Sequence, residues 1–311
     1  MSLVSETLIE VPPYEVIGPR GAPAIVVLGG ISSNRHVCSN GFDPSPGWWE
    51  IVAGRGRALD TTRFQLIGCD FLDGGCGPDG KPECLVRTHD QADAIVAVLD
   101  EIGVEKVEAV VGASYGGMVA LALAERYPLL IENLVVIGAA HEPHPMSTAL
   151  RSLQRRIVEL GLETGRAADA LSLARSLAMT TYRSAGEFAE RFETEPSVTT
   201  ENDAVFPVES YLRHHGERFA SRWRPERFLA LSLSADLHRV TPRDVQTPTL
   251  LVAAEGDSIV PRAQLETLAA GHGGRCRVVD LPSRNGHDAF LTEADALGAI
   301  LSDALNSSIL S

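Results

Sequence analysis

A serine in a glycine-rich turn is the first residue of this chain with the surroundings of a nucleophile. Ser114 lies in the pattern Gly-x-Ser-x-Gly at 112–116, directly after an apolar run at 107–111. A helical stretch follows, so the serine is predicted at a sharp turn from strand to helix, where small neighbours avoid clashes. Such a turn presents the hydroxyl above the edge of a sheet. The pattern therefore predicts nucleophilic catalysis rather than an ordinary glycine-rich turn.

Asp257 and His287 complete the set of residues that a nucleophilic serine requires. Asp257 follows the apolar run 249–253, and His287 comes thirty residues later, beyond the run 276–280. A carboxylate that orients an imidazole base, in the chain order Ser, Asp, His, is one arrangement in which this chemistry occurs. A single Asp or His in a loop would indicate little. Three such residues in this order, each after a predicted strand, predict a Ser-His-Asp triad.

Backbone amides are expected to stabilise the negative charge that develops when a serine attacks a carbonyl carbon. One of them belongs to the residue after the nucleophile, which is Tyr115. The second is expected from Ile31, because the glycines of the segment 28–32 let the backbone approach a substrate closely. We therefore predict an oxyanion hole formed by the amides of Ile31 and Tyr115.

Short apolar runs alternate with amphipathic stretches along most of the chain, which predicts alternating strands and helices. Apolar residues recur at helical spacing over 88–102 and 118–127. The predicted strands are 24–28, 64–68, 107–111, 134–137, 249–253 and 276–280. Repeated strand-helix-strand units form parallel sheets with helices on both faces. The sequence therefore predicts an α/β fold with a mostly parallel, doubly wound sheet.

A long segment interrupts this alternation between Pro143 and Pro248. We interpret 144–247 as a helical cap that is inserted into an α/β core domain made of 1–143 and 248–311. The predicted cap helices are 149–160, 167–181, 185–192 and 228–237, and no strand is expected among them. Deep pockets form between such a cap and a sheet, so the cap is expected to cover the predicted triad.

The composition argues against several classes of function. With 27 Lys and Arg against 41 Asp and Glu, the formal net charge of −14 disfavours binding to nucleic acid or to an anionic membrane. No apolar stretch has the length of a membrane span and the start does not resemble a signal peptide, so a cytoplasmic location is expected. The five cysteines are an odd number and form no C-x-x-C pair, which argues against a disulfide framework and a zinc site. The histidines of segment 141–144 lack the spacing of a zinc-binding helix, and a proline interrupts them, so no metal site is expected there.

Several further segments share features with one known family. They are Gly47-Trp48-Trp49-Glu50, 56–61, Gly74-Gly75-Cys76-Gly77, Thr181-Tyr182-Arg183-Ser184 with 187–192, Glu209-Ser210-Tyr211-Leu212 and Gly286-His287-Asp288-Ala289-Phe290-Leu291. Together with the serine motif they resemble the homoserine O-acyltransferases, which have the α/β-hydrolase fold and transfer acetyl or succinyl groups in methionine biosynthesis. The resemblance extends from about Ile25 to the C-terminus.

The resemblance implies acetyl-CoA or succinyl-CoA as co-substrate without another cofactor, a homoserine-like acceptor, and a homodimer formed through the cap. It also implies that Arg175 and Tyr182 bind the carboxylate of the acceptor and that Asp288 binds its ammonium group. Arg175 and Tyr182 are seven residues apart, close to two helical turns, so they share a helix face. The planar guanidinium suits a carboxylate because it binds both oxygens. Asp288 has a second expected role, as the cap of the helix that follows it.

The chain departs from the family pattern at two places. The segment before the first predicted strand is shorter than the family's N-terminal strand hairpin, so the sheet is expected to lack or shorten one edge. Ala113 and Tyr115 stand where the family commonly has Gly and Met, and both are expected to change the mouth of the acyl pocket.

The leading hypothesis is ping-pong transfer of an acetyl or succinyl group from acyl-CoA to the hydroxyl of L-homoserine, with small-molecule substrates as partners. Transfer to L-serine by the same mechanism is an alternative. A serine esterase or thioesterase would use the same triad with an open pocket. A non-enzymatic binding module that retains an unused triad is the third alternative.

Overall fold

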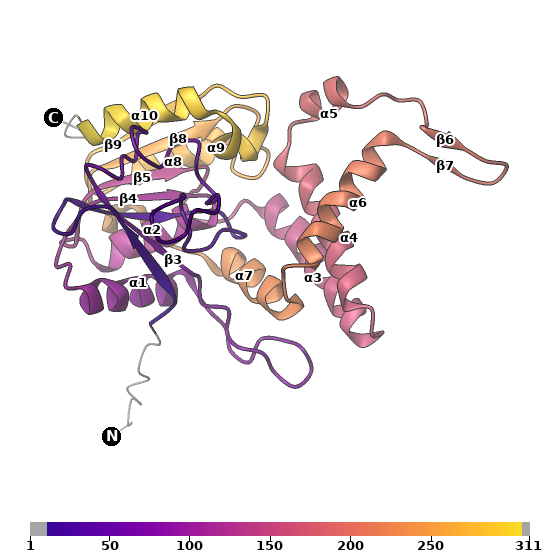
Figure 1. Cartoon of the computed structure of the whole chain (residues 1–311), viewed down its shortest axis with the longest axis horizontal. Coiled ribbons are helices and arrows are strands. Elements are labelled where there is room, and N and C mark those ends of the chain that lie inside the picture. The colour runs from indigo at the N-terminus through magenta and orange to yellow at the C-terminus, as the bar shows by residue number, and fades with distance from the viewer. Residues whose placement is uncertain (1–10, 307–311) are drawn as a thin grey trace.

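The computed structural model describes residues 11–306, which form a twisted sheet with helices on both faces and a helical segment beside it (Figure 1). The described part of the sheet has seven strands in the order β1-β3-β2-β4-β5-β8-β9. Their bounds are Tyr14–Ile17 for β1, Ala24–Leu28 for β2, Gln65–Cys69 for β3, Val107–Ala113 for β4, Ile131–Ile137 for β5, Thr249–Ala254 for β8 and Cys276–Leu281 for β9. β1 is antiparallel to β3, and the other neighbours are parallel.

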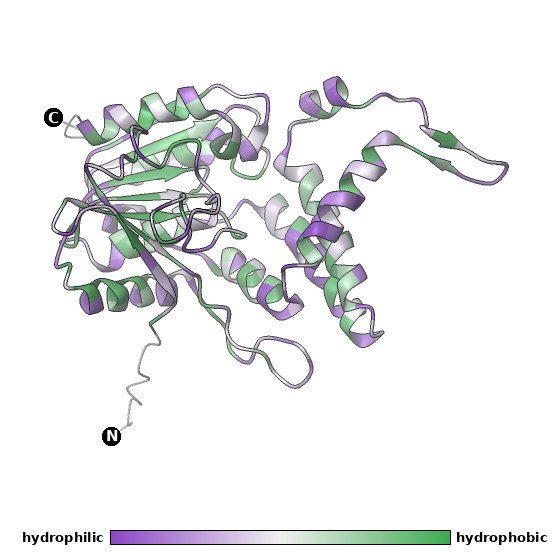
Figure 2. Ribbon diagram, in the orientation of Figure 1, coloured by the Kyte–Doolittle hydropathy of each residue, from purple (hydrophilic) through white to green (hydrophobic). Residues whose placement is uncertain are grey.

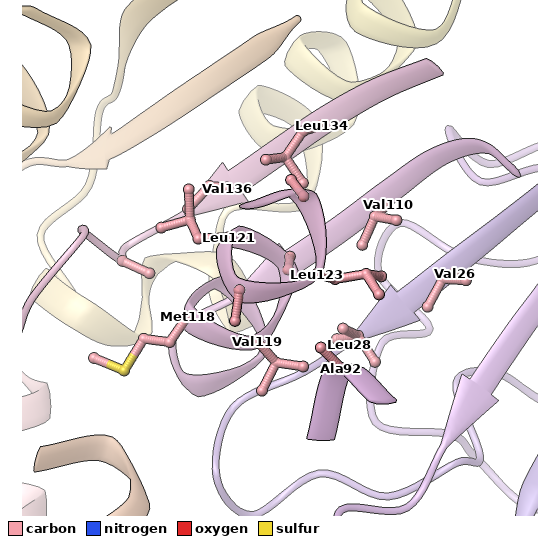
Figure 3. Packing of buried hydrophobic residues seen from close by; sticks show 14 of the residues in the cluster. Val26, Leu28, Ala92, Val110, Met118, Val119, Leu121, Leu123, Leu134 and Val136 are labelled. Carbon is pink, nitrogen blue, oxygen red and sulfur yellow. The ribbon is translucent and has the colours of Figure 1, made fainter. Parts of the chain in front are cut away.

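Five helices of the core domain cover the two faces of the sheet. They are α1 (Thr88–Ile102), α2 (Tyr115–Arg126), α8 (Arg262–Gly271), α9 (Ala289–Thr292) and α10 (Ala294–Asn306). Successive residues of a strand point to opposite faces. Val26 and Val110 accordingly pack with α1 and α2 in one apolar cluster, and Val27 and Val111 pack with α10 in the other. Figure 3 shows the first cluster, in which residues of α2 lie against the strands. This packing fixes the strand ends that carry the site.

The segment between β5 and β8 contains five helices that lie beside the sheet (Figure 1). They are α3 (Pro145–Glu163), α4 (Ala167–Tyr182), α5 (Ala185–Arg191), α6 (Pro207–Ala220) and α7 (Pro225–Leu237). We call this segment the helical insert. α7 lies nearest to the core helices and contacts α1 as well as α3. A short hairpin of β6 (Val198–Thr199) and β7 (Ala204–Val205) extends outward from the insert.

The structure confirms the predicted α/β fold and its parallel strands, and it corrects details. The helix predicted at 88–102 has those bounds, whereas the strand predicted at 64–68 begins and ends one residue later, as β3. β1 and α6 were not predicted. The expectation of an insert without strands is wrong, because β6 and β7 form a two-residue ladder. The N-terminal edge of the described sheet is the single antiparallel strand β1.

The hydropathy of the ribbon follows this architecture. Figure 2 shows hydrophobic residues concentrated in the central strands, and hydrophilic residues alternate with them along the helices. No helix within residues 11–306 combines the length and the apolar character needed to cross a membrane. The five cysteines are free thiols.

Candidate active site

Ser114 forms the turn between β4 and α2 in a strained backbone conformation. Its φ of 54° and ψ of −120° make it the only non-glycine residue with positive φ among residues 11–306. Such a conformation costs of order 1–3 kcal/mol and is retained where the surroundings enforce it. The turn requires glycine nearby: a Cβ on Gly116 would lie 2.4 Å from the carbonyl oxygen of Leu28, and one on Gly112 would lie 2.4 Å from that of Gly116. The tight packing aims the serine hydroxyl out of the sheet.

The three predicted triad residues lie in one hydrogen-bonded chain. His287 Nε2 lies 2.8 Å from Ser114 Oγ, and His287 Nδ1 lies 2.7 Å from Asp257 Oδ2. The other carboxylate oxygen, Asp257 Oδ1, accepts the amides of Ile259 and Val260 at 2.8 and 2.9 Å. Because a carboxylate only accepts, Nδ1 carries the proton donated to Asp257, and Nε2 is left to accept the serine proton. The arrangement has the geometry needed to activate a nucleophile.

The surroundings of the imidazole tune its basicity. His287 and Asp257 are both buried. Burial lowers the pKa of His287, but the charge of Asp257 and its hydrogen bond raise it, and the net pKa lies above the ordinary value of 6.5. The neighbouring Asp288 also raises this pKa, and Arg151 opposes it. His287 is therefore a stronger base than a free imidazole, as proton transfer from a serine requires.

The loop after β2 is tied to the serine turn. The amide of Gly116 donates to the carbonyl oxygen of Gly29 at 2.9 Å. The Tyr115 amide is the first of α2, and the first amides of a helix have no carbonyl partner within it. Ile31 and Tyr115 both line the cavity that contains Ser114. The two residues predicted for the oxyanion hole are thus placed around the nucleophile.

The side chains on either side of Ser114 have different environments. Tyr115 lines the cavity, but its hydroxyl is buried against Ser234 Oγ at 2.7 Å and Gln91 Nε2 at 3.3 Å. Burial raises the pKa of this phenol to about 12. Ala113 is fully buried in the core and does not line the cavity, so its expected effect on the mouth of the acyl pocket is wrong. The departure from the family pattern that reaches the cavity is Tyr115.

Arg175 and Tyr182 lie side by side on α4, as their spacing predicts. Arg175 Cζ lies 5.1 Å from the ring centroid of Tyr182 and 4.9 Å from that of Phe219. The ring of Tyr182 in turn lies 6.1 Å from that of His287, centroid to centroid. Tyr182 lines the cavity of Ser114, whereas Arg175 lines a neighbouring cavity. The pair therefore connects the two cavities.

Asp288 is buried beside His287 in the short helix Gly286–Asp288. Burial raises its pKa, although the positive charges of Arg183, His287 and Arg175 oppose the shift. Arg183, whose role the sequence did not predict, forms an ion pair with Asp288, with Nε 3.0 Å from Oδ2. Asp288 precedes α9, but its side chain makes no capping hydrogen bond. The prediction that it caps this helix is wrong.

The neighbouring cavity is rich in arginine. Its volume is about 510 Å³, and its basic lining residues are Arg175, His215, Arg218, Arg222, Arg224 and Arg227. Arg224 and Arg227 pair with Asp73, whereas Arg218 and Arg222 have no ion pair within the part of the chain that the structure describes. The sequence did not indicate this cluster because its members come from three helices, α4, α6 and α7, and from the loop between α6 and α7.

The comparisons with known proteins agree with this geometry. A model of the α/β hydrolase fold family matches residues 23–294. A homoserine O-succinyltransferase from Xanthomonas campestris is 42% identical over 292 residues, which cover 94% of this chain and 78% of that protein. The chain belongs to the homoserine O-acyltransferase family.

Two further comparisons show the breadth of this acyltransferase family. A serine O-succinyltransferase from Litchfieldella anticariensis is 31% identical over 335 residues, which cover 94% of this chain and 91% of that protein. The solved structure of homoserine O-acetyltransferase from Bacillus anthracis matches the fold with a TM-score of 0.85 at 17% identity, covering 96% of this chain and 92% of that one. The resemblance stated from the sequence motifs is confirmed.

In this member of the homoserine O-acyltransferase family, the cavity of Ser114 also contains polar residues that the sequence analysis missed. Arg151 and Gln154, both on α3, line it together with Ser147. Their spacing of four and three residues places them on one face of a helix. The sequence predicted this helix from 149 but no role for its polar face. A polar stripe on a helix that covers a cavity was the available signal.

Proposed function

We propose that the protein is an acyl-CoA-dependent acyltransferase that acylates the hydroxyl of L-homoserine by a ping-pong mechanism. The observation that carries this proposal is the hydrogen-bonded chain Ser114–His287–Asp257 in a cavity between the sheet edge and the helical insert. The names of the relatives supply the reaction class. Supply of O-acylhomoserine to methionine biosynthesis is the pathway we expect for this product.

In the first half-reaction, Ser114 Oγ attacks the thioester carbonyl while His287 Nε2 accepts its proton. The amides of Tyr115 and Ile31 stabilise the oxyanion of the tetrahedral intermediate. The C–S bond then breaks, and the imidazolium returns the proton to the CoA thiolate. An acyl-enzyme ester on Ser114 and free CoA result.

In the second half-reaction, the hydroxyl of homoserine occupies the place that the thiol has left. His287 takes its proton, and the oxygen attacks the acyl carbon. When the intermediate collapses, Ser114 Oγ recovers the proton and the O-acyl amino acid leaves. The helices α3, α4 and α7 contribute to a narrow cavity, which disfavours water as the competing acceptor.

Two charged residues beside the cavity suit an amino acid. Arg175 is held between two aromatic rings and forms no ion pair within residues 11–306, so its guanidinium is available for the carboxylate of the acceptor. Asp288 is buried, and its Oδ2 forms the ion pair with Arg183. Its Oδ1 is left to accept a hydrogen bond from the ammonium group of the acceptor. Tyr182 completes the set between Arg175 and His287.

The arginine-rich cavity supports CoA as the carrier of the acyl group. CoA has three phosphates, and a guanidinium binds phosphate with two parallel hydrogen bonds. The cavity adjoins the catalytic one, because Ser32 in its lining follows Ile31 in the chain and Arg175 contacts Tyr182. A CoA molecule whose phosphates occupy this cavity would place its thioester toward Ser114.

The insert also presents apolar residues to solvent. Leu153 and Leu160 on α3 and Leu173 on α4 are exposed by 57, 45 and 59%. Leu153 and Leu160 are seven residues apart on α3 and so share one face of that helix, and exposed apolar side chains of this kind suit a protein interface. We propose that the protein forms a homodimer through this surface, and sedimentation analysis of the L153E and L173E variants tests it: the proposal requires that they shift toward monomer.

A matrix of two donors and two acceptors, with a control that contains no amino acid, tests the proposed function. Acetyl-CoA and succinyl-CoA are each combined with homoserine, serine or no amino acid, and acylation of Ser114, release of CoA and formation of ester are followed separately. We expect a rapid burst of one CoA per active site as Ser114 is acylated, slow further release of CoA without amino acid, and ester formation with homoserine. Fast continued release of CoA without an acceptor would identify a thioesterase, ester formation with serine alone would identify the serine enzyme, and a complete lack of acylation would indicate a binding module.

A further inference from the structure

Tyr115 contributes to the site through its backbone and through its side chain. Its amide is the predicted oxyanion donor after Ser114, whereas its side chain is buried and its hydroxyl lies 2.7 Å from the Oγ of Ser234 on α7. Gln91 on α1 donates its Nε2 to the same hydroxyl at 3.3 Å. The phenol next to the nucleophile is thus bound by a helix of the core and by a helix of the insert.

The side-chain amide of Gln91 has a fixed orientation. Its Oε1 accepts the amide of Leu72 at 2.9 Å, and its Nε2 donates to the carbonyl oxygen of Leu72 at 2.8 Å. Because Nε2 carries two hydrogens, its second N–H is free to donate to Tyr115. The ring of Phe71 meets that of Tyr115 edge-on, with the ring centroids 4.8 Å apart. These contacts fix the phenol in one position.

The helix that presents Ser234 is anchored to the core. His238 follows α7 directly and is fully buried, with its Nδ1 2.9 Å from Thr88 Oγ1 and its Nε2 3.1 Å from the carbonyl oxygen of Ala140. Burial lowers the pKa of His238 to about 3, so the imidazole is neutral and can donate to Ala140 while it accepts from Thr88. Ser234 therefore belongs to a helix whose end is held against the core.

The backbone of the serine turn depends on support of this kind. Ser114 has the strained φ of 54°, and such a conformation persists only where the surroundings enforce it. An oxyanion donor must lie about 2.7–3.1 Å from the oxygen that it stabilises, and a misplacement of about 1 Å can lower a rate about 100-fold. A side chain that is bound at its tip restrains its own Cα and the amide beside it. The contacts of the Tyr115 hydroxyl therefore bear on the position of the Tyr115 amide.

We propose that Tyr115 is a positioning residue, whose side chain holds its own backbone amide in the oxyanion hole through hydrogen bonds to Ser234 and Gln91. This inference rests on the proposed acyl-transfer mechanism and adds Ser234, a residue of the insert, to the groups that support its chemistry. Ser234 acts through Tyr115, since it faces the phenol while Ala235 lines the cavity. The hydroxyl transfers no proton in either half-reaction, because burial raises its pKa to about 12.

Tyr115→Phe removes the hydroxyl and retains the ring. Loss of a whole oxyanion donor lowers kcat by about 100- to 1,000-fold, and a displaced donor should cost less. We expect kcat/KM to fall about 10-fold for acylation of Ser114 and by a similar factor for transfer to the amino acid, because the same amide serves both transition states. The preferences between acetyl-CoA and succinyl-CoA, and between homoserine and serine, should not change. Stopped flow measures acylation, and quantification of the O-acyl amino acid measures transfer.

A transition-state analogue separates this role from a loss of packing. Trifluoroacetonyl-CoA carries a trifluoromethyl ketone in place of the thioester: Ser114 Oγ adds to the carbonyl carbon, His287 takes the serine proton, and the hemiketal oxyanion occupies the oxyanion hole. In Tyr115→Phe the inhibition constant of this compound should rise by the factor by which kcat/KM falls. The dissociation constant of free CoA, which forms no oxyanion, should not change.

Ser234→Ala removes the partner of the phenol, and Ser232→Ala is its matched control. Both serines are fully buried on α7, but Ser232 Oγ accepts from Arg155 Nη1 at 3.0 Å, whereas Ser234 Oγ bonds to Tyr115. Ser234→Ala should reproduce most of the loss seen in Tyr115→Phe, and the double variant should lose no more than Tyr115→Phe, because both changes remove the same hydrogen bond. Ser232→Ala should leave the rates and the inhibition constant unchanged. Melting temperatures establish that each variant is folded.

Three results would overturn the inference. The first is acylation of Tyr115→Phe at the unmodified rate, and the second is an inhibition constant that does not follow the rate. The third is an equal loss in Ser232→Ala and Ser234→Ala, which would indicate a general disturbance of α7. Failure of the proposed function is a different observation, since the unmodified protein would then not be acylated by acyl-CoA. The same variants would in that case be compared on para-nitrophenyl acetate, whose hydrolysis uses the same oxyanion hole.

Discussion

The edge of the sheet and the helical insert contribute different kinds of side chain to the same cavity. At the sheet edge, both oxygens of Asp257 and both nitrogens of His287 already have hydrogen-bond partners within the protein. In the insert, the guanidinium of Arg175 packs against two aromatic rings and forms no ion pair among the described residues, and no hydrogen bond holds the side chain of Gln154 there. The triad is preorganised, whereas the side chains proposed for recognition have unused donors.

This difference predicts two classes of variant, those that impair the reaction with every substrate and those that impair it with one. A change at the sheet edge should impair the reaction with any donor and any acceptor, because every substrate passes through the same serine and base. A change in the insert should impair one substrate and spare the others. The following predictions, from the largest effect to the smallest, test this division.

Ser114→Ala removes the nucleophile and should abolish transfer. Loss of a triad nucleophile lowers kcat by roughly four to six orders of magnitude. The loss should be the same with acetyl-CoA and succinyl-CoA, and no acyl-enzyme should be detected by mass spectrometry. The fold should persist, because alanine fits the space of serine, and circular dichroism checks it. Activity close to that of the unmodified protein would refute the assignment of Ser114.

Asp257→Asn should lower kcat by about 10⁴-fold. An amide can donate to Nδ1, so it favours the imidazole tautomer whose Nε2 carries the proton and cannot accept one from Ser114. Steady-state kinetics with two donors and two acceptors measure the effect, which should be uniform across all four combinations. A loss confined to one acceptor would contradict the proposed division.

Arg175→Leu should impair only the half-reaction that uses the amino acid. Loss of a charge-assisted pair of hydrogen bonds in a desolvated site costs about 2–4 kcal/mol, a factor of roughly 30–1,000 in kcat/KM for homoserine. Acylation of Ser114, followed by stopped flow, should be nearly unchanged. Arg175→Lys should recover part of the loss. Equal losses in both half-reactions would instead indicate that Arg175 positions the insert.

The pH dependence of acylation should report the raised pKa of His287. Burial lowers this pKa, but the charge of Asp257 and its hydrogen bond raise it by more than burial lowers it. The net pKa therefore lies above 6.5. The neutral imidazole is the active form. We therefore expect kcat/KM to be low at pH values below this pKa, where His287 is protonated, and to rise as the pH increases through it. Asp257→Asn removes the negative charge and should move the inflection of the residual activity to lower pH. An inflection that does not move would separate Asp257 from the titrating group.

The sequence was most informative about the core and the triad. Buried parallel strands are continuous apolar runs, so β2, β4 and β8 could be recognised directly. Their carboxyl ends meet at one sheet edge, and Ser114, Asp257 and His287 follow such strands. The tertiary contacts that complete the triad follow from this topology, and their existence could therefore be predicted from chain order.

The helical insert was harder to predict, because no sheet fixes which ends of its helices meet. The ion pair between Arg183 and Asp288 joins residues on distant segments, and nothing in the local pattern around Asp288 distinguishes it from a helix cap. β1 is a four-residue strand whose pairing with β3 depends on tertiary context. The stripe of Arg151 and Gln154 has the same spacing as a solvent-facing stripe, and only the packing of α3 decides which it is.

The hydrogen bond between Ser114 Oγ and His287 Nε2 joins positions that are 173 residues apart in the chain. At a synthesis rate of about 5–20 residues per second, roughly 10–35 s separate the appearance of the two side chains during translation. The serine turn, its glycines and the strands around it precede His287 in the chain, so the nucleophile emerges from the ribosome without its base. A chain whose synthesis has not yet passed His287 therefore lacks the base of the triad, and Ser114 is not activated until that residue has emerged and the core has folded.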